Sequence, residues 1–309
     1  MKSLCVVFLA SAVSIILSGA QVDAVSSGGG AASFYVGMDE FSEGSGSFLI
    51  SPALPEEEPA CRKLSVSFSA ADGTIASHRV NEFIEAVNTW YQENTFSQFE
   101  WAGEPPYQNP DLSPIERSYG YQVQLRYLLS PHFGLDARWI SEQGSSATGF
   151  ESFAFSGDQT RFVHLQGDML LDVILSGPSL GALWCEPILF PGTTATLFGG
   201  IGYYTGTLEW RSSEQWFLQE EPGPPEEWFN LWHSHGRGEA LGYYAGADVR
   251  VALGENIGLV GAVQYRCIVI DSIQYTTLIE GAPAVSEIPL PQQLDFSGLG
   301  SCIGLVLCL

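Results

Sequence analysis

The sequence predicts an all-β protein: a closed, antiparallel, up-and-down transmembrane β-barrel of about eight strands, with one short amphipathic helix in its first long loop. Three observations predict this fold. Apolar and polar residues alternate with a period of two through most of the 309-residue chain. Several alternating runs are ten residues or longer, whereas strands of soluble proteins average about five or six and tilted membrane strands need about 9–11. Short and long connections alternate between many of the runs.

The amino-acid composition excludes several classes of function. The net charge is −23, and only 15% of the residues are charged, compared with roughly 25% in typical soluble domains. The chain has only two lysines, Lys2 and Lys63, and so lacks the basic surface that nucleic-acid binding requires. Its aromatic content of 12% excludes disorder for most of the chain. It has no phosphate-cradling loop and no CxxC pair, and we expect no cofactor.

The first 24 residues have the pattern of an export signal. Lys2 supplies a positive start, residues 4–17 form an apolar run, and residues 22–24 have the short side chains that a signal peptidase reads. The apolar run is shorter than the roughly 20 residues that a membrane-spanning helix needs. We predict a signal peptide at residues 1–24, an irregular periplasmic segment at 25–62 and a barrel domain at 63–309.

The strands follow from the alternation. Residues 119–129 carry tyrosine, valine and leucine at odd positions, with glutamine and arginine between them. The first strand is placed at 63–71, and an earlier candidate at 34–41 competes for that role. The predicted strands span residues 63–71, 118–129, 133–142, 161–175, 194–210, 239–253, 257–270 and 295–309. An even number returns both ends of the barrel to the periplasmic side.

One amphipathic helix is predicted from Ser77 onward. Its apolar residues follow helical spacing and are Val80, Phe83, Ile84, Val87 and Tyr91. We expect this helix to be a lid that packs on the barrel mouth or partly fills the lumen. A helix that contacts a partner or the membrane surface is the alternative.

The connections predict which end of the barrel faces outward. Residues 130–132 and 254–256 are predicted periplasmic turns, and residues 143–160, 211–238 and 272–293 are predicted extracellular loops. The connection 176–193 is long where this scheme expects a short turn. Aromatic residues near the long connections are typical of an interfacial girdle, and they are Tyr119, Tyr121, Trp139 and Tyr243.

These features together resemble a known family. The hairpins at 119–139 and 242–265 and the terminal strand at 295–309 resemble small bacterial outer-membrane β-barrel proteins of the eight-stranded OmpA/OmpX-like kind. The chain departs from that pattern because it ends in Leu309 rather than in phenylalanine. The resemblance implies a bacterial outer-membrane location, with outer-membrane lipid and the outer-membrane insertion machinery as partners.

Charged residues at predicted inward positions form a candidate structural site. An eight-stranded barrel has an interior that side chains just fill, and buried charges must be paired. We therefore predict a lumen ionic network of Arg126, Asp136, Arg138, Asp168, Asp172, Asp248, Arg250 and Arg266. If Leu129 faces Phe133 across the turn, Arg126 lies opposite Asp136.

Cysteine and histidine residues give weaker candidates. Five cysteines follow the predicted signal peptide, so at least one is unpaired within a monomer. Cys61 precedes the first strand, and Cys308 lies at the periplasmic end of the last strand, which is next to the first in a closed barrel. The two are a possible disulfide, with Cys185 as a competing partner. His233 and His235 share a strand face, but an HxH pair alone is weak, and we predict no metal site.

The leading functional prediction is a non-enzymatic outer-membrane barrel with a filled lumen, in a structural or surface-binding role. Its acidic, aromatic-rich loops at 143–160, 211–238 and 272–293 would contact an extracellular protein or glycan. The alternatives are a lipid-modifying outer-membrane enzyme, a small-solute transporter and a soluble secreted β-sandwich. No serine, histidine and carboxylate set stands out on an outward strand face, which disfavours an enzyme.

Overall fold

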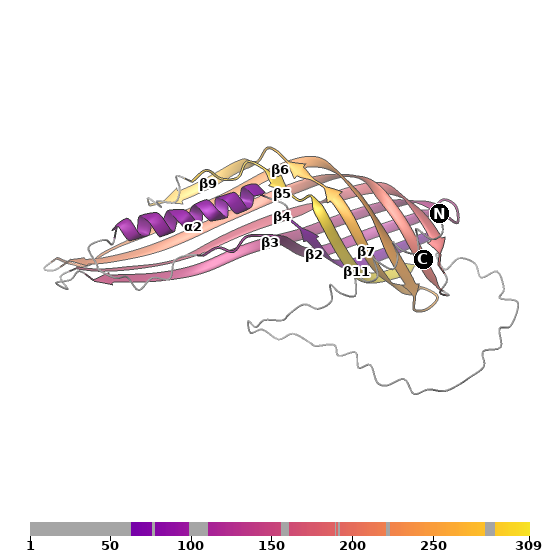
Figure 1. Cartoon of the computed structure of the whole chain (residues 1–309), viewed down its shortest axis with the longest axis horizontal. Coiled ribbons are helices and arrows are strands. Elements are labelled where there is room, and N and C mark those ends of the chain that lie inside the picture. Colours follow the sequence, from indigo (N-terminus) through magenta and orange to yellow (C-terminus); the bar gives the residue numbers. More distant parts are fainter. Residues whose placement is uncertain are drawn as a thin grey trace, which may run out of the picture. The chain divides into compact units, whose positions relative to one another are not determined.

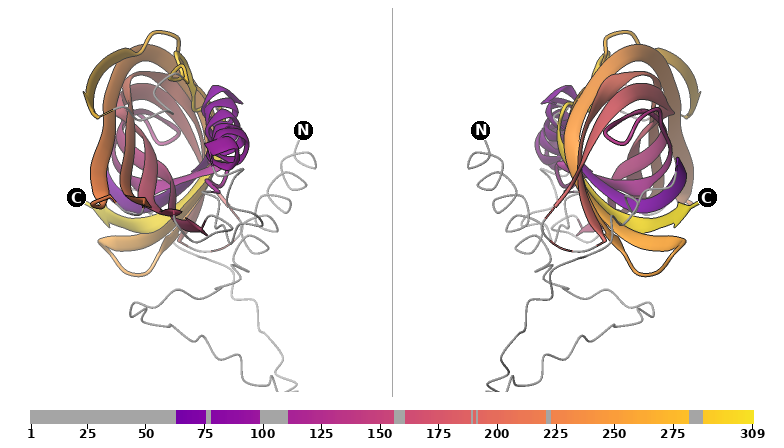
Figure 2. Two further views of the ribbon diagram at one scale, coloured as in Figure 1. Left: turned by 90° about the vertical axis from the view of Figure 1, so that its left-hand side faces the viewer. Right: turned by 90° about the vertical axis from the view of Figure 1, so that its right-hand side faces the viewer.

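Eight strands of the computed structural model form a closed antiparallel ring, as the sequence predicts. They are β1 (Leu64–Thr74), β2 (Arg117–Leu128), β3 (Phe133–Phe155), β4 (Arg161–Pro187), β5 (Thr193–Glu220), β6 (Glu226–Ala252), β7 (Ile257–Cys267) and β11 (Gly298–Cys308). Each strand pairs with the next in that order, and β11 pairs with β1 to close the ring, which Figure 2 shows end-on.

The structure describes residues 63–75, 78–98, 111–155, 161–188, 190, 192–220, 223–281 and 288–309. The predicted signal peptide at 1–24, the segment at 25–62 and the alternative first strand at 34–41 lie outside these residues. The described first strand, β1, coincides with the candidate at 63–71.

Four strands are much longer than the sequence predicts. β3, β4, β5 and β6 have 23, 27, 28 and 27 residues, whereas the other four strands of the ring have 11 or 12. Their far ends continue the sheet beyond the barrel (Figure 1). We call this part the extension; it comprises residues 144–155, 161–176, 205–220 and 226–239, together with β9 (Gln274–Glu280), which pairs with β6.

The long strands correct the predicted connections. Residues 143–160 and 211–238 are mainly strand rather than loop, and part of 272–293 forms β9. The connection 176–193 is also mainly strand, because β4 continues to Pro187 and β5 begins at Thr193. Only a short turn remains there, so short turns lie at one end of the barrel throughout.

Side-chain polarity inverts along the long strands where the extension begins. In β4, odd-numbered residues point inward over the whole length, and they change from buried leucines at 165, 171 and 175 to Ser179 and Gly181. Outward residues change in the opposite sense, from the exposed Asp168 to Leu180, which is 61% exposed. The extension therefore has an apolar interior and a polar outside, whereas the barrel has the reverse arrangement.

Exposed apolar side chains cover the outer face of the barrel. Aromatic residues bound this band at both ends. Near the extension they are Tyr119, Tyr121, Trp139, Tyr203 and Tyr243, and near the short turns they are Tyr127, Phe133, Trp184 and Phe190. Two aromatic girdles around an apolar band are the pattern of a strand barrel in a lipid bilayer.

Helix α2 (His78–Gln98) covers the inner face of the extension (Figure 1). Its five predicted apolar residues are all buried, and the Phe83 ring packs edge-on against Trp210 at 5.2 Å between centroids. The helix has 21 residues, so it is longer than predicted, and it packs against the extension rather than within the barrel lumen. Within the described residues, no helix is both long and apolar enough to cross a membrane.

Two asparagines of α2 form hydrogen bonds with the backbone of the segment that precedes β2. Asn88 donates to the Leu112 carbonyl at 2.9 Å and accepts from the Leu112 amide at 3.0 Å. Asn81 forms the same pair of bonds with Ile115, at 3.4 and 2.9 Å. Leu112 and Ile115 are buried, so each asparagine satisfies two backbone groups that have little access to water.

We expect Asn88→Ala to loosen the helix. The change leaves the backbone amide and carbonyl of Leu112 without these partners, at a cost of about 1–3 kcal/mol for each buried group that water does not reach. Hydrogen exchange of the α2 amides in micelles should become faster than in the wild type. Thr89→Ala, at an exposed position of the same helix, is the control, and equal exchange rates in both variants would contradict the role of Asn88.

A short inward-turning segment closes the barrel mouth. β8 (Val269–Ile270) pairs with β10 (Leu294–Asp295), and nearby Ile268 and Phe296 are almost fully buried. The predicted strands 257–270 and 295–309 are therefore both interrupted, at Ile268 and before Gly298. Gly206 and Gly238 make room for this segment, because a Cβ at either position would lie within 2.5 Å of an Ile270 methyl carbon.

Candidate functional site

A connected network of buried charges fills the barrel lumen around Arg126. Its guanidinium binds both carboxylate oxygens of Asp248, with Nη1 and Oδ1 3.2 Å apart, and its Nε lies 3.4 Å from Asp136 Oδ1. All three side chains are at most 3% exposed. The register places Arg126 opposite Asp136, as the hairpin pattern predicts.

Arg138 and Arg250 extend this network across the lumen. The Arg138 guanidinium binds Asp136, donates to Gln264 at 3.0 Å and stacks on the Phe198 ring, 3.7 Å from its centroid. Arg250 donates to Ser65 and to Gln124, at 2.9 and 3.2 Å. These contacts join β1, β2, β3, β5, β6 and β7, so the network braces the barrel wall from within.

A second ion pair lies under the closed mouth. Arg266 donates through Nη1 to Glu142 Oε1 at 2.6 Å and through Nε to the Phe296 carbonyl at 3.0 Å. Sequence reasoning missed Glu142 because the predicted strand ended there. Residues two apart in a strand face the same side of the sheet. Glu142 is an even number of residues from Asp136 and Arg138 on the same strand, so the alternation alone could have placed it in the lumen.

Two predicted network members lie elsewhere. Asp168 and Asp172 are on the outward face of β4 in the extension, and Asp168 is exposed. The prediction assumed that the polar face of β4 points inward along its whole length, but polarity inverts beyond the barrel. Six of the eight predicted residues thus lie inside the barrel: five belong to the network around Arg126, and Arg266 forms its own pair with Glu142.

A separate polar cluster is buried beneath α2. The Tyr91 hydroxyl donates to Glu214, and the same carboxylate accepts from Trp216 Nε1 and Asn230 Nδ2, each at 3.2 Å. Burial, together with the Glu214 charge, raises the pKa of Tyr91 well above its usual range. The cluster joins the helix to β5 and β6 by hydrogen bonds that sequence reasoning did not predict.

The cysteine and histidine candidates do not converge on one site. Cys61 lies outside the described residues, so its pairing with Cys308 stays a prediction. Cys185 is not in a connection as expected: it lies within β4 and points inward, 3.5 Å from Thr196 Oγ1. His233 and His235 lie on the outward side of β6, with His233 3.3 Å from Glu209. Among the residues that the structure describes, no three metal-ligating side chains converge.

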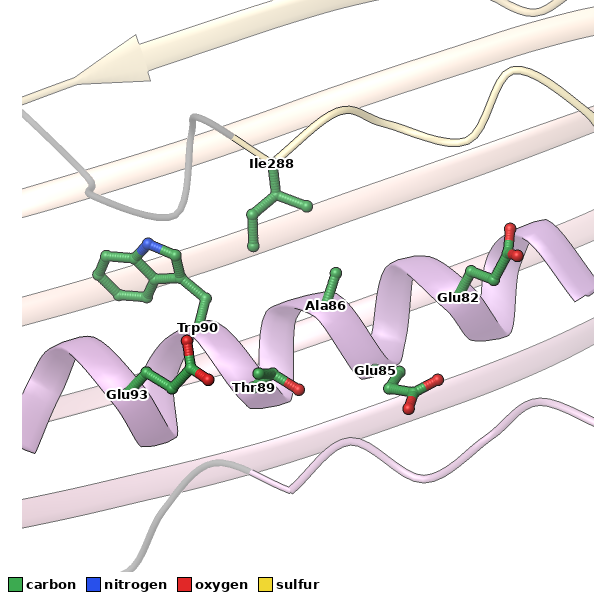
Figure 3. Close-up of a pocket in the computed structure, with 7 residues that line it drawn as sticks. All are labelled: Glu82, Glu85, Ala86, Thr89, Trp90, Glu93 and Ile288. Carbon is green, nitrogen blue, oxygen red and sulfur yellow. The ribbon is translucent and has the colours of Figure 1, made fainter.

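The outer side of α2 carries an acidic hollow of about 440 Å³. Glu82, Glu85 and Glu93 line it together with Trp90 and Ile288 (Figure 3). Glu82 forms ion pairs with His78 and Arg79 on its own helix. The hollow is open to solvent, and its carboxylates are typical of a hydrated helix face.

The filled lumen predicts how the protein behaves in a bilayer. We expect the full chain in planar lipid bilayers to give no large, steady single-channel conductance, because arginine side chains and the β8–β10 segment occupy the interior. A general porin measured in the same bilayers is the control. A stable, large conductance from this chain would contradict a filled lumen.

No family model and no curated protein matches the sequence. Among solved structures, the chain is similar to the attachment invasion locus protein Ail of Yersinia pestis in complex with a heparin analogue, at 12% identity over 79% of this chain and 96% of that chain, with a TM-score of 0.30. It is also similar to the outer-membrane protein OprG of Pseudomonas aeruginosa, at 9% identity over 80% and 95%, with a TM-score of 0.36.

A major outer-membrane protein of Thermus thermophilus matches at 12% identity over 79% of this chain and 98% of that chain, with a TM-score of 0.32. The identities and TM-scores are low for all three structures. The barrel fold of this chain follows from its own strand pairings.

Proposed function

We propose that the chain is an integral outer-membrane β-barrel protein whose lumen is sealed and whose extension is a surface-binding module outside the cell. The polarity inversion along the long strands carries this proposal. The outer face of the barrel is apolar, as expected for strands in contact with lipid. The extension has a polar outer face and an apolar interior, as expected for a structure in water. The same continuous strands would therefore form both a membrane anchor and a water-exposed module.

The positions of the short turns support the proposal that the extension faces the outside of the cell. Short turns connect β2 to β3, β4 to β5 and β6 to β7, and β1 begins and β11 ends at that same end of the barrel. Outer-membrane barrels keep short turns in the periplasm and longer elements outside. The extension and α2 would then face the extracellular medium.

The lumen favours a structural role over catalysis. Asp136, Asp248 and Glu142 each form an ion pair with an arginine. A general acid or base needs a proton position that substrate can reach. These carboxylates are buried and engaged, so we assign them to stability and assign recognition to the extension.

Cysteine labelling in whole cells tests this arrangement. Ala147→Cys places a thiol on the exposed face of the extension, and Glu255→Cys places one in a short turn. We expect a polymer-linked maleimide that cannot cross the outer membrane to label the first variant on intact cells and the second only after lysis. The wild type gives the background from the native cysteines. Labelling of Glu255→Cys alone on intact cells would reverse the proposed orientation.

A further inference from the structure

Three rows of outward side chains cross β3, β4, β5 and β6 near the far end of the extension. The first row is Glu151, Gln166, Gln215 and Phe229; the second is Gly149, Asp168, Ser213 and Leu231; the third is Ala147, Leu170, Arg211 and His233. The first row carries long side chains throughout and the third row carries them except at Ala147, whereas the middle row has small residues at Gly149 and Ser213, with Asp168 between them and Leu231 at its end. The middle row is therefore the floor of a groove that runs across the strands.

Two adjoining hollows fill this groove. Their volumes are about 530 and 520 Å³, and both are lined by Gly149, Asp168 and Ser213. Because neighbouring strands lie about 4.8 Å apart, four strands give a floor roughly 14 Å long. We call this feature the transverse groove; its length suits an elongated ligand.

Hydrogen bonds hold one wall of the transverse groove in place. Gln166 Nε2 donates to Gln215 Oε1 at 2.6 Å, and Gln215 in turn donates to Glu227. Glu151 is fixed by His164, whose Nε2 lies 2.9 Å from its carboxylate. These hydrogen bonds restrain the side chains of the wall without a ligand, so binding would lose less conformational entropy.

The chemistry of the groove fits many hydroxyl groups. The floor offers the Asp168 carboxylate as an acceptor and the Ser213 hydroxyl as donor or acceptor. Arg211 donates through Nη2 to Glu209 outside the groove and offers its other N–H donors at the opposite wall. Phe229 is 52% exposed beside them and presents an aromatic ring to apolar ligand faces. Both charge signs occur in the groove, and the chain's net charge of −23 disfavours a polyanion.

We propose that the transverse groove binds a short, uncharged oligosaccharide. The inference rests on the proposed function, in which the extension meets the extracellular medium. It goes further because it names the ligand class and the residues that bind it: Asp168, Ser213 and Arg211 by hydrogen bonds, and Phe229 by packing against a sugar ring.

Binding to the purified full chain tests the groove. Calorimetry with maltotriose, cellotriose and chitotriose is performed in a detergent without a sugar headgroup. We expect at least one of the three to bind. We expect Asp168→Ala to weaken that binding by about tenfold or more, the effect of losing one good polar contact, and Gly149→Leu to weaken it by about tenfold or more because its side chain occupies the groove. A Cβ at Gly149 has ordinary contacts, at 3.4 Å from Asp168 Oδ1, so the variant fills the groove without straining the strand.

Ser145→Leu is the matched control, because Ser145 lies on the same face of β3 outside the groove. We expect its binding to equal that of the wild type. The proposal is overturned if none of the three sugars binds, or if Gly149→Leu binds as the wild type does. Salt-sensitive binding of a heparin fragment in place of these sugars would also overturn it. The measurement uses purified protein, so its failure is distinct from a wrong membrane orientation, which the cell labelling detects.

Discussion

Replacing Asp248 with alanine is expected to destabilise the folded barrel by about 3–5 kcal/mol, because it leaves a buried arginine charge without its main partner. Arg126 and Asp248 are at most 3% exposed, and both carboxylate oxygens bind the guanidinium. Among the described residues, the other ion pair of Arg126 is with Asp136, which is shared with Arg138. A urea titration in lipid vesicles, followed by the gel mobility of unheated samples, measures the loss.

Asp168→Ala is the control variant, because the structure and the sequence prediction give different expectations for its stability. The sequence placed Asp168 in the same lumen network, whereas it lies exposed on the extension. We expect its urea midpoint to stay close to that of the wild type, since exposed substitutions usually change stability by about 0.5 kcal/mol or less. Equal losses in the two variants would mean that the lumen network does not hold the barrel together.

The sequence predicted the barrel more completely than the extension, and the reason is physical. Alternation reports that a strand has two different faces, but it does not report which face meets lipid. Leu165 and Leu180 both lie in apolar alternations of β4, yet the first packs beneath α2 and the second is exposed on the barrel. The two segments differ in parity, odd before the boundary and even after it. In the proposed arrangement, that change of parity marks where the strand leaves the membrane.

The sequence predicted those contacts of the lumen network whose residues lie close together in the chain. Arg126, Asp136 and Arg138 lie on one hairpin, so register alone places them together. The partner of Arg266 is on a distant strand, and this partner, Glu142, is the last residue of the predicted strand 133–142, whereas β3 continues to Phe155. The closed mouth was missed because residues 268–270 are an apolar run that continues the alternating segment before it, although the chain turns inward there.

The transverse groove depends on four strands, β3 to β6, being longer than a membrane crossing. Its floor residues Gly149 and Ser213 are small and lie in segments that the sequence assigned to loops, where glycine and serine are common and do not indicate a binding site. Once β3, β4 and β5 are paired through these positions, the same residues form one row. Strand pairing, which a single sequence does not report, is what turns them into a candidate site.

Arginine substitutions on β4 provide the sharpest test of the polarity inversion. Leu180 and Ile174 lie on the same outward face of one strand, six residues apart, with Leu180 in the apolar band and Ile174 in the extension. We expect Leu180→Arg to cost about 2–4 kcal/mol of unfolding free energy in lipid vesicles, since it places a cation in the bilayer. Ile174→Arg faces water, and we expect it to cost less than about 1 kcal/mol. If both variants lose the same stability, or if Ile174→Arg loses more, the membrane boundary does not lie between these residues, and the apolar outer band would need an explanation other than lipid.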